Sequence, residues 1–248
     1  MKFSVSAASH IGCVRRNNED MILVQEKFVR NGKFWTMADT CEMDRYLIAL
    51  ADGMGGHNSG EVASSDVLHN LQFYYSDLPS GLKVGDFTEA IYVWLESINS
   101  FIDAKGHTDP KYLDMGTTLV ALAFYNGSFY WMNCGDSRMY RLRDDSFEQL
   151  TIDHSLNTLM GSSEHTSIIT NCIGAGCTTS YIDMMQLTEN DIQSGDIFLL
   201  CSDGLTDMVT DDQIYNLLIN GADATKLCLS AEAAGGLDNV SACVIKIV

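Results

Sequence analysis

Three aspartates, Asp52, Asp203 and Asp238, occupy the same kind of local setting. Each stands where an apolar, strand-like segment meets a glycine-containing corner, so strand ends could bring them to one edge of a sheet. Hard divalent cations such as Mg²⁺ and Mn²⁺ prefer carboxylate, carbonyl and water oxygens. Clustered aspartates repel one another unless a cation neutralises them. An Asp-Gly pair taken alone is more often an ordinary turn. The pattern therefore leaves two interpretations open, three separate turns or one metal cluster.

A second polar concentration lies near the start of the chain, in Gly12–Asp20. Arg15 there could hold phosphate oxygens in a charge-assisted fork, which a lysine would do less specifically. Glu19 and Asp20 could orient water on a metal ion. The alternative for this segment is a solvated charged loop.

Other catalytic patterns are not met. The glycine-rich stretch Asp52–Gly60 lacks the Gly-Lys-Ser/Thr ending of a P-loop, and the six histidines form no H-E-x-x-H zinc motif. No G-x-S-x-G elbow supports a serine nucleophile. Cys172 and Cys177 lie near two glycines, which favours a flexible corner over a zinc clasp.

The elements that must position these residues are strands and two long helices. Apolar residues recur at three- and four-residue steps over Asp86–Lys105, and a second helix is expected over Glu61–Ser76. Short apolar or β-rich runs predict strands at Met21–Gln25, Tyr46–Ala51, Thr117–Phe124, Phe129–Cys134, Met139–Arg143, Phe147–Leu150, Tyr181–Leu187, Gly195–Cys201 and Val240–Val248. Further helical stretches are expected near Asp211–Leu218 and Ala222–Ala234.

The order of these elements predicts an α+β fold. Tight turns, among them the hairpin signal Asn126-Gly127, join the consecutive strands of residues 117–150, which predicts an antiparallel meander. Two antiparallel sheets packed face to face, with helices covering the outside, fit this order. No proline-rich or serine-rich linker divides the 248 residues, so we expect one domain.

Composition restricts the partners and the compartment. The net charge of −18 disfavours nucleic acid and anionic membrane surfaces. No apolar run has the length of a membrane span, and the first residues lack a signal-peptide core. Eight cysteines without a C-x-x-C pair are typical of free thiols in a reducing compartment. We therefore expect a cytoplasmic protein.

Taken together, these segments resemble the type 2C family of metal-dependent serine/threonine protein phosphatases in its compact bacterial form. The matching motifs follow the family's order: Gly12–Asp20 (GCVRRNNED), Asp52–Ser64 (DGMGGHNSGEVAS), Met115–Thr118 (MGTT), Asn133–Arg138 (NCGDSR), Cys201–Leu205 (CSDGL) and Gly236–Ser241 (GLDNVS). Each motif is weak alone, but the ordered set is specific and runs through nearly the whole chain.

The resemblance implies a four-layer αββα sandwich, with residues 1–248 forming one catalytic domain. It implies that Asp52 bridges two metal ions, Mn²⁺ or Mg²⁺, and that the Gly53 carbonyl binds one of them. It further assigns metal contacts to Asp203, Asp238, Glu19 and Asp20, phosphate binding to Arg15, and support of a metal ligand to Asn239. A hydroxide bridging the two metals would attack the phosphoserine or phosphothreonine ester.

Three positions depart from the family pattern. Met54 stands where eukaryotic members carry a histidine proposed as the leaving-group acid, and His57 lies nearby in sequence. The flap region, about residues 153–180, is short and rich in Ser and Thr over Gly161–Thr170, which puts substrate choice in doubt. Asp114, beside the MGTT motif, is a candidate ligand for a third metal ion.

The resulting prediction is a metal-dependent phosphoric monoester hydrolase that acts in signal transduction. Its expected partners are phosphorylated proteins, a serine/threonine kinase and its targets, and we expect a monomer. Two alternatives stay open. One is a phosphoprotein-binding module with weak catalysis, and the other is a phosphatase of small molecules.

Overall fold

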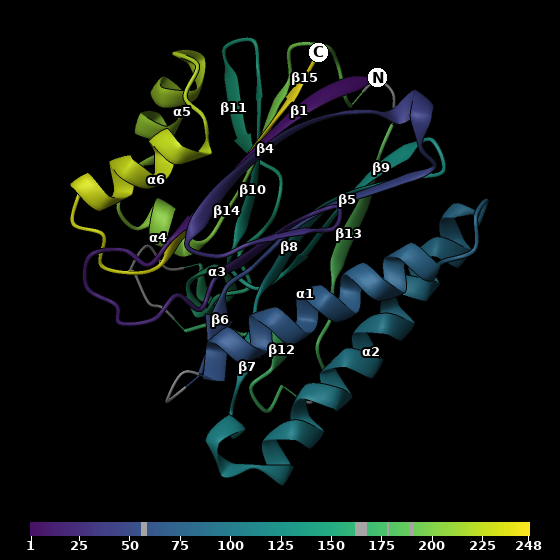
Figure 1. The fold of residues 1–248 in the computed structure, drawn as a ribbon, viewed down its shortest axis with the longest axis vertical. Helices are drawn as coiled ribbons and strands as arrows, with labels where there is room; N and C mark the ends of the chain where they lie inside the picture. The colour runs from purple at the N-terminus through teal and green to yellow at the C-terminus, as the bar shows by residue number, and fades with distance from the viewer. Residues whose placement is uncertain (56–58, 162–167, 178, 189–190) are drawn as a thin grey trace.

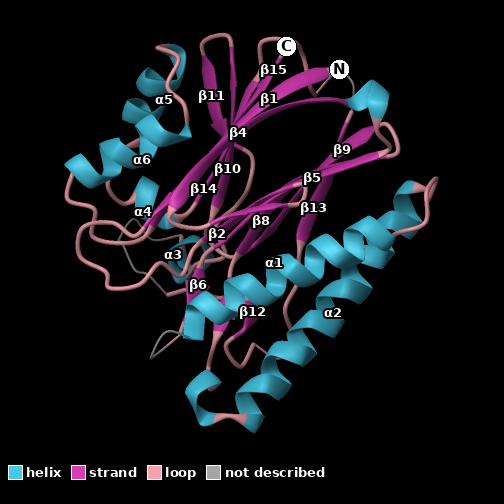
Figure 2. Ribbon diagram, in the orientation of Figure 1, coloured by secondary structure: helices cyan, strands magenta, loops and turns pink. Residues whose placement is uncertain are grey.

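The computed structural model describes residues 1–55, 59–161, 168–177, 179–188 and 191–248. Two large sheets pack face to face, and helices cover the outer face of each (Figures 1 and 2). Every strand pair in these sheets is antiparallel. The four-layer αββα sandwich expected from the sequence is confirmed.

The first large sheet contains both ends of the chain. Its strand order is β11 (Ser146–Gln149), β10 (Arg138–Arg143), β14 (Ile197–Cys201), β15 (Val240–Ile247), β1 (Lys2–His10) and β4 (Gly32–Asp39). β1 pairs with β15 over its length, from Phe3 opposite Ile247 to His10 opposite Val240. The N-terminal loop and the turn before β15 therefore emerge at the same end of this sheet.

The second large sheet has the order β13 (Asp183–Leu187), β9 (Ser128–Cys134), β8 (Leu119–Tyr125), β5 (Arg45–Ala51), β2 (Met21–Val24) and β3 (Lys27–Val29). A small third sheet, β12 (Ile173–Gly174), β7 (Gly116–Thr117) and β6 (Gly53–Met54), continues from the end of β5. Its pairing places Gly53 opposite Thr117 and so connects the corner after Asp52 to the MGTT motif.

The helices form the two outer layers. α1 (Ser59–Asp77) and α2 (Val84–Thr108) cover the second sheet, whereas α4 (Asp203–Thr206), α5 (Asp211–Ile219) and α6 (Ala224–Ala233) cover the first (Figure 1). Short helical turns complete the described elements: α3 (Leu156–Met160), η1 (Thr40–Glu42) and η2 (Pro110–Tyr112).

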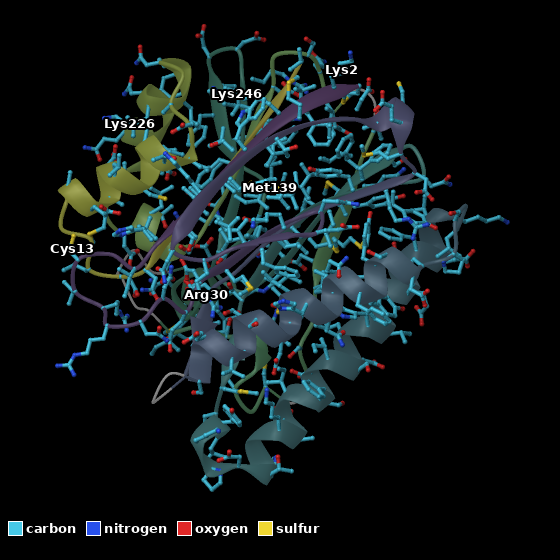
Figure 3. The ribbon with its side chains drawn as sticks, viewed as in Figure 1. Lys2, Cys13, Arg30, Met139, Lys226 and Lys246 are labelled. Carbon is cyan, nitrogen blue, oxygen red and sulfur yellow. The ribbon has the colours of Figure 1, made fainter. Side chains whose placement is uncertain are left out.

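Three apolar cores correspond to the three interfaces between layers. Phe3, Ile22 and Phe198 belong to the core between the sheets, and side chains of this core fill the interior of Figure 3 around Met139. Leu68 and Trp94 pack α1 and α2 onto the second sheet, and Leu227 packs α6 onto the first. Each large sheet buries one face against the other sheet and the opposite face against helices, so the packing of a sheet depends on the layers on both sides of it.

One expectation from the sequence is wrong. The strands of residues 117–150 do not form a single meander, because β8 and β9 belong to the second sheet whereas β10 and β11 belong to the first. The Asn126-Gly127 hairpin between β8 and β9 is confirmed, and both turn residues have positive φ, as a type I′ turn requires. The chain crosses between the sheets after Cys134, where Gly135 has a φ of 119°.

Two further features bear on the predicted compartment. All eight cysteines are free thiols, and five of them are buried. In the described ranges, no helix combines the length and apolarity that a bilayer crossing requires.

Candidate metal centre

A cavity of about 240 Å³ opens where the two large sheets and the small sheet meet. Four aspartates in its wall come from four separate segments: Asp52 after β5, Asp136 between β9 and β10, Asp203 at the start of α4, and Asp238 just before β15. The rest of the described wall is Arg15, Glu19, Gly53, Met54, Gly55, Ile169 and Asn239. Strand ends therefore do gather the three aspartates that the sequence singled out.

The backbone of Asp52 is fixed by the MGTT motif. Its N–H donates to Thr118 Oγ1 at 3.0 Å, and its carbonyl accepts from Thr118 N at 2.9 Å and from Thr117 Oγ1 at 2.8 Å. Both threonines are buried. The next residue, Gly53, has no room for a side chain, because a Cβ there would lie 2.1 Å from the Gly60 carbonyl oxygen. This corner accordingly holds the Asp52 carboxylate in place with little freedom.

Asp136 is positioned by the crossover between the sheets. His154 N donates to the Gly135 carbonyl at 3.0 Å, and Gly135 N donates to His154 Nδ1 at 3.1 Å. Asn133 Nδ2 donates to the same Gly135 carbonyl at 3.2 Å. These bonds fix the turn that changes sheets and place Asp136 in the cavity wall.

Asp203 and Asp238 come from adjoining turns at the end of the first sheet. Gly204 packs directly beneath Asn239, since a Cβ on Gly204 would lie 1.9 Å from the Asn239 carbonyl oxygen. Asn239 N in turn donates to Asp238 Oδ1 at 2.7 Å. Glycine at position 204 therefore permits the approach that puts both carboxylates in one cavity.

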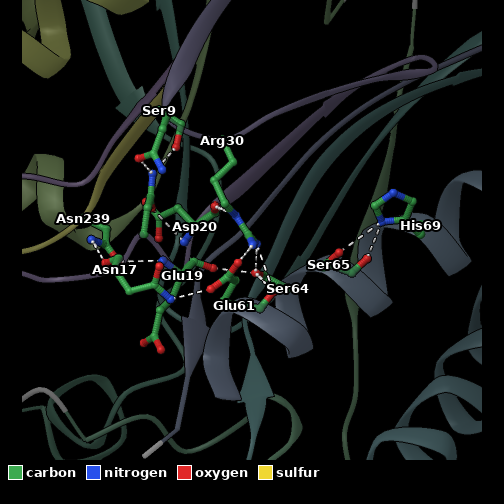
Figure 4. Close-up of polar contacts among 12 residues, drawn as sticks. Ser9, Asn17, Glu19, Asp20, Arg30, Glu61, Ser64, Ser65, His69 and Asn239 are labelled. Carbon is green, nitrogen blue, oxygen red and sulfur yellow. Dashed lines mark hydrogen bonds and ion pairs between the residues drawn. The ribbon is translucent and has the colours of Figure 1, made fainter. Parts of the chain in front are cut away.

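The loop before β2 contributes Glu19 and Asp20. Asp20 is fully buried, and Ser202 Oγ donates to its Oδ2 at 2.8 Å. Asn239 Oδ1 accepts from Glu19 N at 2.8 Å, as the dashed lines in Figure 4 show. The expectation that Asn239 supports the ligand set thus has a structural counterpart in its contact with the Glu19 backbone.

The cluster of carboxylates in and beside the cavity favours binding of a cation. Burial, followed by repulsion from Asp203, raises the pKa of Asp136 to about 7. Burial and neighbouring carboxylates also raise the pKa values of Asp20, Asp52 and Asp203. Several anions packed together out of water would be costly without a cation to compensate for them.

Unpartnered oxygens test whether these residues suit a metal ion. Asp20 Oδ1, Asp136 Oδ1 and Asp203 Oδ1 are buried and accept no hydrogen bond. Buried oxygens are normally paired, so three unpaired carboxylate oxygens beside one cavity indicate an electrophile that binds them. Among the described residues, no group of three or more acidic, His or Cys side chains is already gathered as a cation cage. The donor set, made of carboxylates and backbone carbonyls, fits Mg²⁺ or Mn²⁺ with water completing the shell.

Arg15 lies at the mouth of the cavity with half of its side chain exposed. Its Nη2 donates to Asp238 Oδ2 at 2.5 Å. The pKa of Arg15 is raised in spite of its partial burial, because Asp238, Glu19 and Asp52 stabilise the charged guanidinium. Arg15 is thus the cation that faces the open side of the acidic cluster.

Of the residues expected at the site, the fully buried Asp20 and the exposed Asp114 are not part of the cavity wall, and the others are. Asp114 is exposed and lies in the turn after η2, whereas Asp136 lines the cavity. Asp136 was missed although the NCGDSR motif contains it. Its signal is an aspartate at a glycine-containing corner where a strand-like run meets a turn, the kind of setting that the other three share. Met54 lines the cavity, whereas His57 and part of Gly161–Thr170 lie outside the described residues.

The flap region contributes Ile169 to the cavity wall. Ile169 forms an isolated bridge with Ser155, and the Ile168 carbonyl accepts from Leu156 N at 2.9 Å. Nothing in the local sequence marks this residue, because a lone isoleucine in a polar loop has no pattern.

Comparison with known proteins gives consistent results. A family model described as protein phosphatase 2C matches residues 36–229. The serine/threonine protein phosphatase PstP of Mycobacterium tuberculosis is 33% identical, over 98% of this chain and 45% of its own length. This chain therefore spans less than half of that relative. Protein phosphatase PhpP of Streptococcus pneumoniae is 32% identical, over 98% of this chain and 97% of its own.

Solved structures agree in fold. A serine/threonine phosphatase from S. agalactiae superposes with a TM-score of 0.82 at 28% identity, covering 99% of this chain and 100% of its own. The catalytic domain of PstP in complex with two manganese ions superposes with a TM-score of 0.75 at 32% identity, and each chain is covered completely.

Proposed function

The chain belongs to the protein phosphatase 2C family, and we propose that its carboxylate cavity hydrolyses phosphoserine and phosphothreonine esters of proteins with bound divalent cations. The observation that carries this proposal is the set of unpartnered buried oxygens on Asp20, Asp136 and Asp203. Such oxygens are expected where cations bind and not where a protein merely turns a corner. The named activities of the family relatives support the same reaction.

The cavity offers enough ligands for two cations, Mn²⁺ or Mg²⁺. Asp52 would bridge them, with the Gly53 carbonyl on one. The remaining contacts would come from Asp203, Asp238, Glu19 and Asp20, and a third cation would use Asp136 beside Asp203. The manganese pair of the PstP domain supports this count.

When bound, the cations would supply positive charge beside the phosphate and an ionised water as nucleophile. The chain's own residues do the rest. Arg15, at the open side of the cavity, would hold phosphate oxygens with its fork of donors. Met54 offers no proton for the leaving serine or threonine oxygen. The described part of the cavity wall also contains no histidine that could supply one.

Substrates, partners and location extend this proposal. The relatives are named as protein phosphatases, which supports phosphorylated proteins as substrates and a serine/threonine kinase with its targets as partners. The three cores join elements from both ends of the chain, which supports treating residues 1–248 as one catalytic domain with a short flap. The cytoplasmic location and the monomeric state stay predictions.

The test compares two substrates at increasing Mn²⁺ or Mg²⁺ concentration, a phosphothreonine peptide and a generic aryl phosphate. We expect cation-dependent turnover of both, with the peptide preferred by kcat/KM. Asp203→Ala should abolish turnover and weaken cation binding while the circular dichroism spectrum stays unchanged. Cation binding without turnover of either substrate would indicate a phosphoprotein-binding module, and unchanged turnover in Asp203→Ala would overturn the ligand assignment.

A further inference from the structure

Arg30 is a largely buried arginine at the turn between β3 and β4, outside the cavity wall. Its guanidinium reaches the junction between the Glu19–Asp20 loop and the start of α1 (Figures 3 and 4). Nε donates to the Asp20 carbonyl at 2.9 Å, and Nη2 donates to the Glu61 carbonyl at 3.0 Å. One side chain therefore ties the loop that carries Asp20 to the first turn of a helix.

Ser64 extends this connection to Glu19. Arg30 Nη2 donates to Ser64 Oγ at 2.7 Å, and Ser64 Oγ donates to the Glu19 carbonyl at 2.5 Å. Gly53 N donates to the same Glu19 carbonyl at 3.2 Å. The backbone of Glu19 is thereby linked to both Arg30 and the corner that follows Asp52.

Asn239 holds the same segment from the opposite side. Its Oδ1 accepts from Glu19 N, and its Nδ2 donates to the carbonyls of Ile11 at 2.9 Å and Asn17 at 2.8 Å. Figure 4 shows Asn239 and Arg30 on either side of Glu19 and Asp20. The two acidic residues are consequently held between one clamp at the end of the first sheet and another on α1.

The positive charge of Arg30 also contributes to holding this loop. Its guanidinium forms an ion pair with Glu61, 3.3 Å from Nη1 to Oε1, and it attracts Asp20 and Glu19. Glu61 also accepts from Asn17 Nδ2 at 2.5 Å. Arg30 is therefore a fixed positive charge beside the acidic loop and outside the cavity wall.

We propose that Arg30 is a positioning residue that holds Glu19 and Asp20 in register with Asp52 and thereby sets the affinity of the cavity for divalent cations. The inference rests on the proposed function only in that the cavity binds cations. Groups that orient metal ligands from outside the coordination shell commonly change metal affinity 10- to 100-fold when removed. Loss of Arg30 removes the donor of the Asp20 carbonyl and the link from that loop to α1, so the loop relaxes and cation binding must also order it.

The experiment measures Mn²⁺ affinity by calorimetry in Arg30→Met, which keeps an unbranched apolar stem and removes every donor. We expect binding about 10- to 100-fold weaker than in the unsubstituted chain. Arg30→Lys should lie between the two, because a lysine keeps the charge but not the fork. The rise in Tm on adding saturating Mn²⁺ should shrink in Arg30→Met in parallel.

Arg45→Met is the matched control. Arg45 lies in β5 and contacts the other end of α1, the helix that Arg30 contacts at its start. Arg45 is equally buried and donates through Nη1 to the carbonyls of Tyr75, Ser76 and Leu78. Removal of Arg45 should lower Tm yet leave Mn²⁺ affinity within about twofold, because substitutions at distant sites that share no partners act independently. Equal loss of affinity in both variants would show a general structural effect and overturn the inference.

The remaining outcomes separate this inference from the proposed function. Absence of Mn²⁺ binding in the unsubstituted chain would count against the function itself. Binding there, with the same affinity in Arg30→Met, would overturn only the role of Arg30. If Arg30→Met does not fold, Arg30→Lys and Ser64→Ala carry the test, and unchanged affinity in both would reject the proposal.

Discussion

Arg15 and Asp238 form an ion pair across the mouth of the cavity, with 2.5 Å between Nη2 and Oδ2. The residue assigned to phosphate therefore contacts a residue assigned to a cation. A carboxylate oxygen shared with a guanidinium is less available to a metal ion, because the two positive partners compete for it. This pair leads to opposite expectations for catalysis and for cation binding.

Arg15→Ala should lower kcat/KM for a phosphothreonine peptide by about 100-fold or more, since a donor to the transferring phosphoryl group is lost. Mn²⁺ affinity should stay equal or rise, because Asp238 loses its competitor. Arg15→Lys should recover only part of the rate. Steady-state kinetics and calorimetry measure the two effects separately, and weaker Mn²⁺ binding in Arg15→Ala would mean that Arg15 holds Asp238 in place.

The stability of the metal-free protein should fall as pH rises. Burial raises the pKa of Asp136 to about 7 from an ordinary value of 3.8, so the folded state binds more protons than the unfolded state between these values. Each extra bound proton gives a slope of about −1.4 kcal/mol of unfolding free energy per pH unit. The pKa values of Asp20, Asp52 and Asp203 shift in the same direction.

Thermal unfolding in EDTA from pH 5 to 8 measures this slope. We expect Tm to decrease with pH in EDTA, to decrease less in saturating Mn²⁺, and to decrease less in Asp136→Asn without metal. A metal-free Tm that rises steadily over this range would contradict the assignment of raised pKa values to buried carboxylates.

Ile169 should influence how the substrate phosphate is received. Ile169→Asp adds an anion to a cavity wall that already carries five carboxylates, so kcat/KM should fall by about tenfold or more through repulsion. Ile169→Val should change it by less than about twofold. Ile168→Asp is the charge-matched control, because Ile168 is 55% exposed and outside the wall. Equal losses in both aspartate variants would assign the effect to the loop as a whole.

Gly204→Ala should damage both the fold and the site. A Cβ would lie 1.9 Å from the Asn239 carbonyl oxygen, so the turns carrying Asp203 and Asp238 must separate. We expect a loss of about 2–3 kcal/mol in unfolding free energy together with weaker Mn²⁺ binding.

Gly85→Ala is the opposite case within α2. No atom lies within 4 Å of a Cβ at position 85, and alanine is the better helix former, so a gain of about 0.5–1 kcal/mol is expected. Chemical denaturation of both variants checks the pair. A Gly204→Ala protein as stable as the original would show that the turns can move without cost.

Local patterns predicted elements well and their neighbours poorly. The helix predicted over Asp86–Lys105 is α2, and the hairpin predicted at Asn126-Gly127 is present between β8 and β9. Periodicity reports which face of a strand is apolar but not which sheet the strand joins. The change of sheet at Gly135 has no counterpart in this periodicity, so the strands on either side of it look like neighbours in a meander. β1 was not assigned, because its sequence KFSVSAASH is rich in Ser and Ala, although most of it is buried.

The site divides in the same way. Asp52, Asp203 and Asp238 share a local setting that sequence reasoning could use, and the ordered motifs gave them roles. Asp136 has that setting too, and its place in the cavity follows from a change of sheet that no local pattern reports. Arg30 has no local signal at all, because its partners Glu61 and Ser64 lie more than thirty residues away in sequence.

The pairing of β1 with β15 also determines when the centre can form during protein synthesis. The loop after β1 supplies Arg15, Glu19 and Asp20, while Asp238 and Asn239 immediately precede β15. On the ribosome, β1 can pair early with β4, but β15 is translated more than two hundred residues later, so the early loop lacks its Asn239 contacts until that residue has been made. A nascent chain that has exposed its first acidic residues is thus not yet able to bind cations with the native ligand set, which is complete only after Asp238 and Asn239 have been translated.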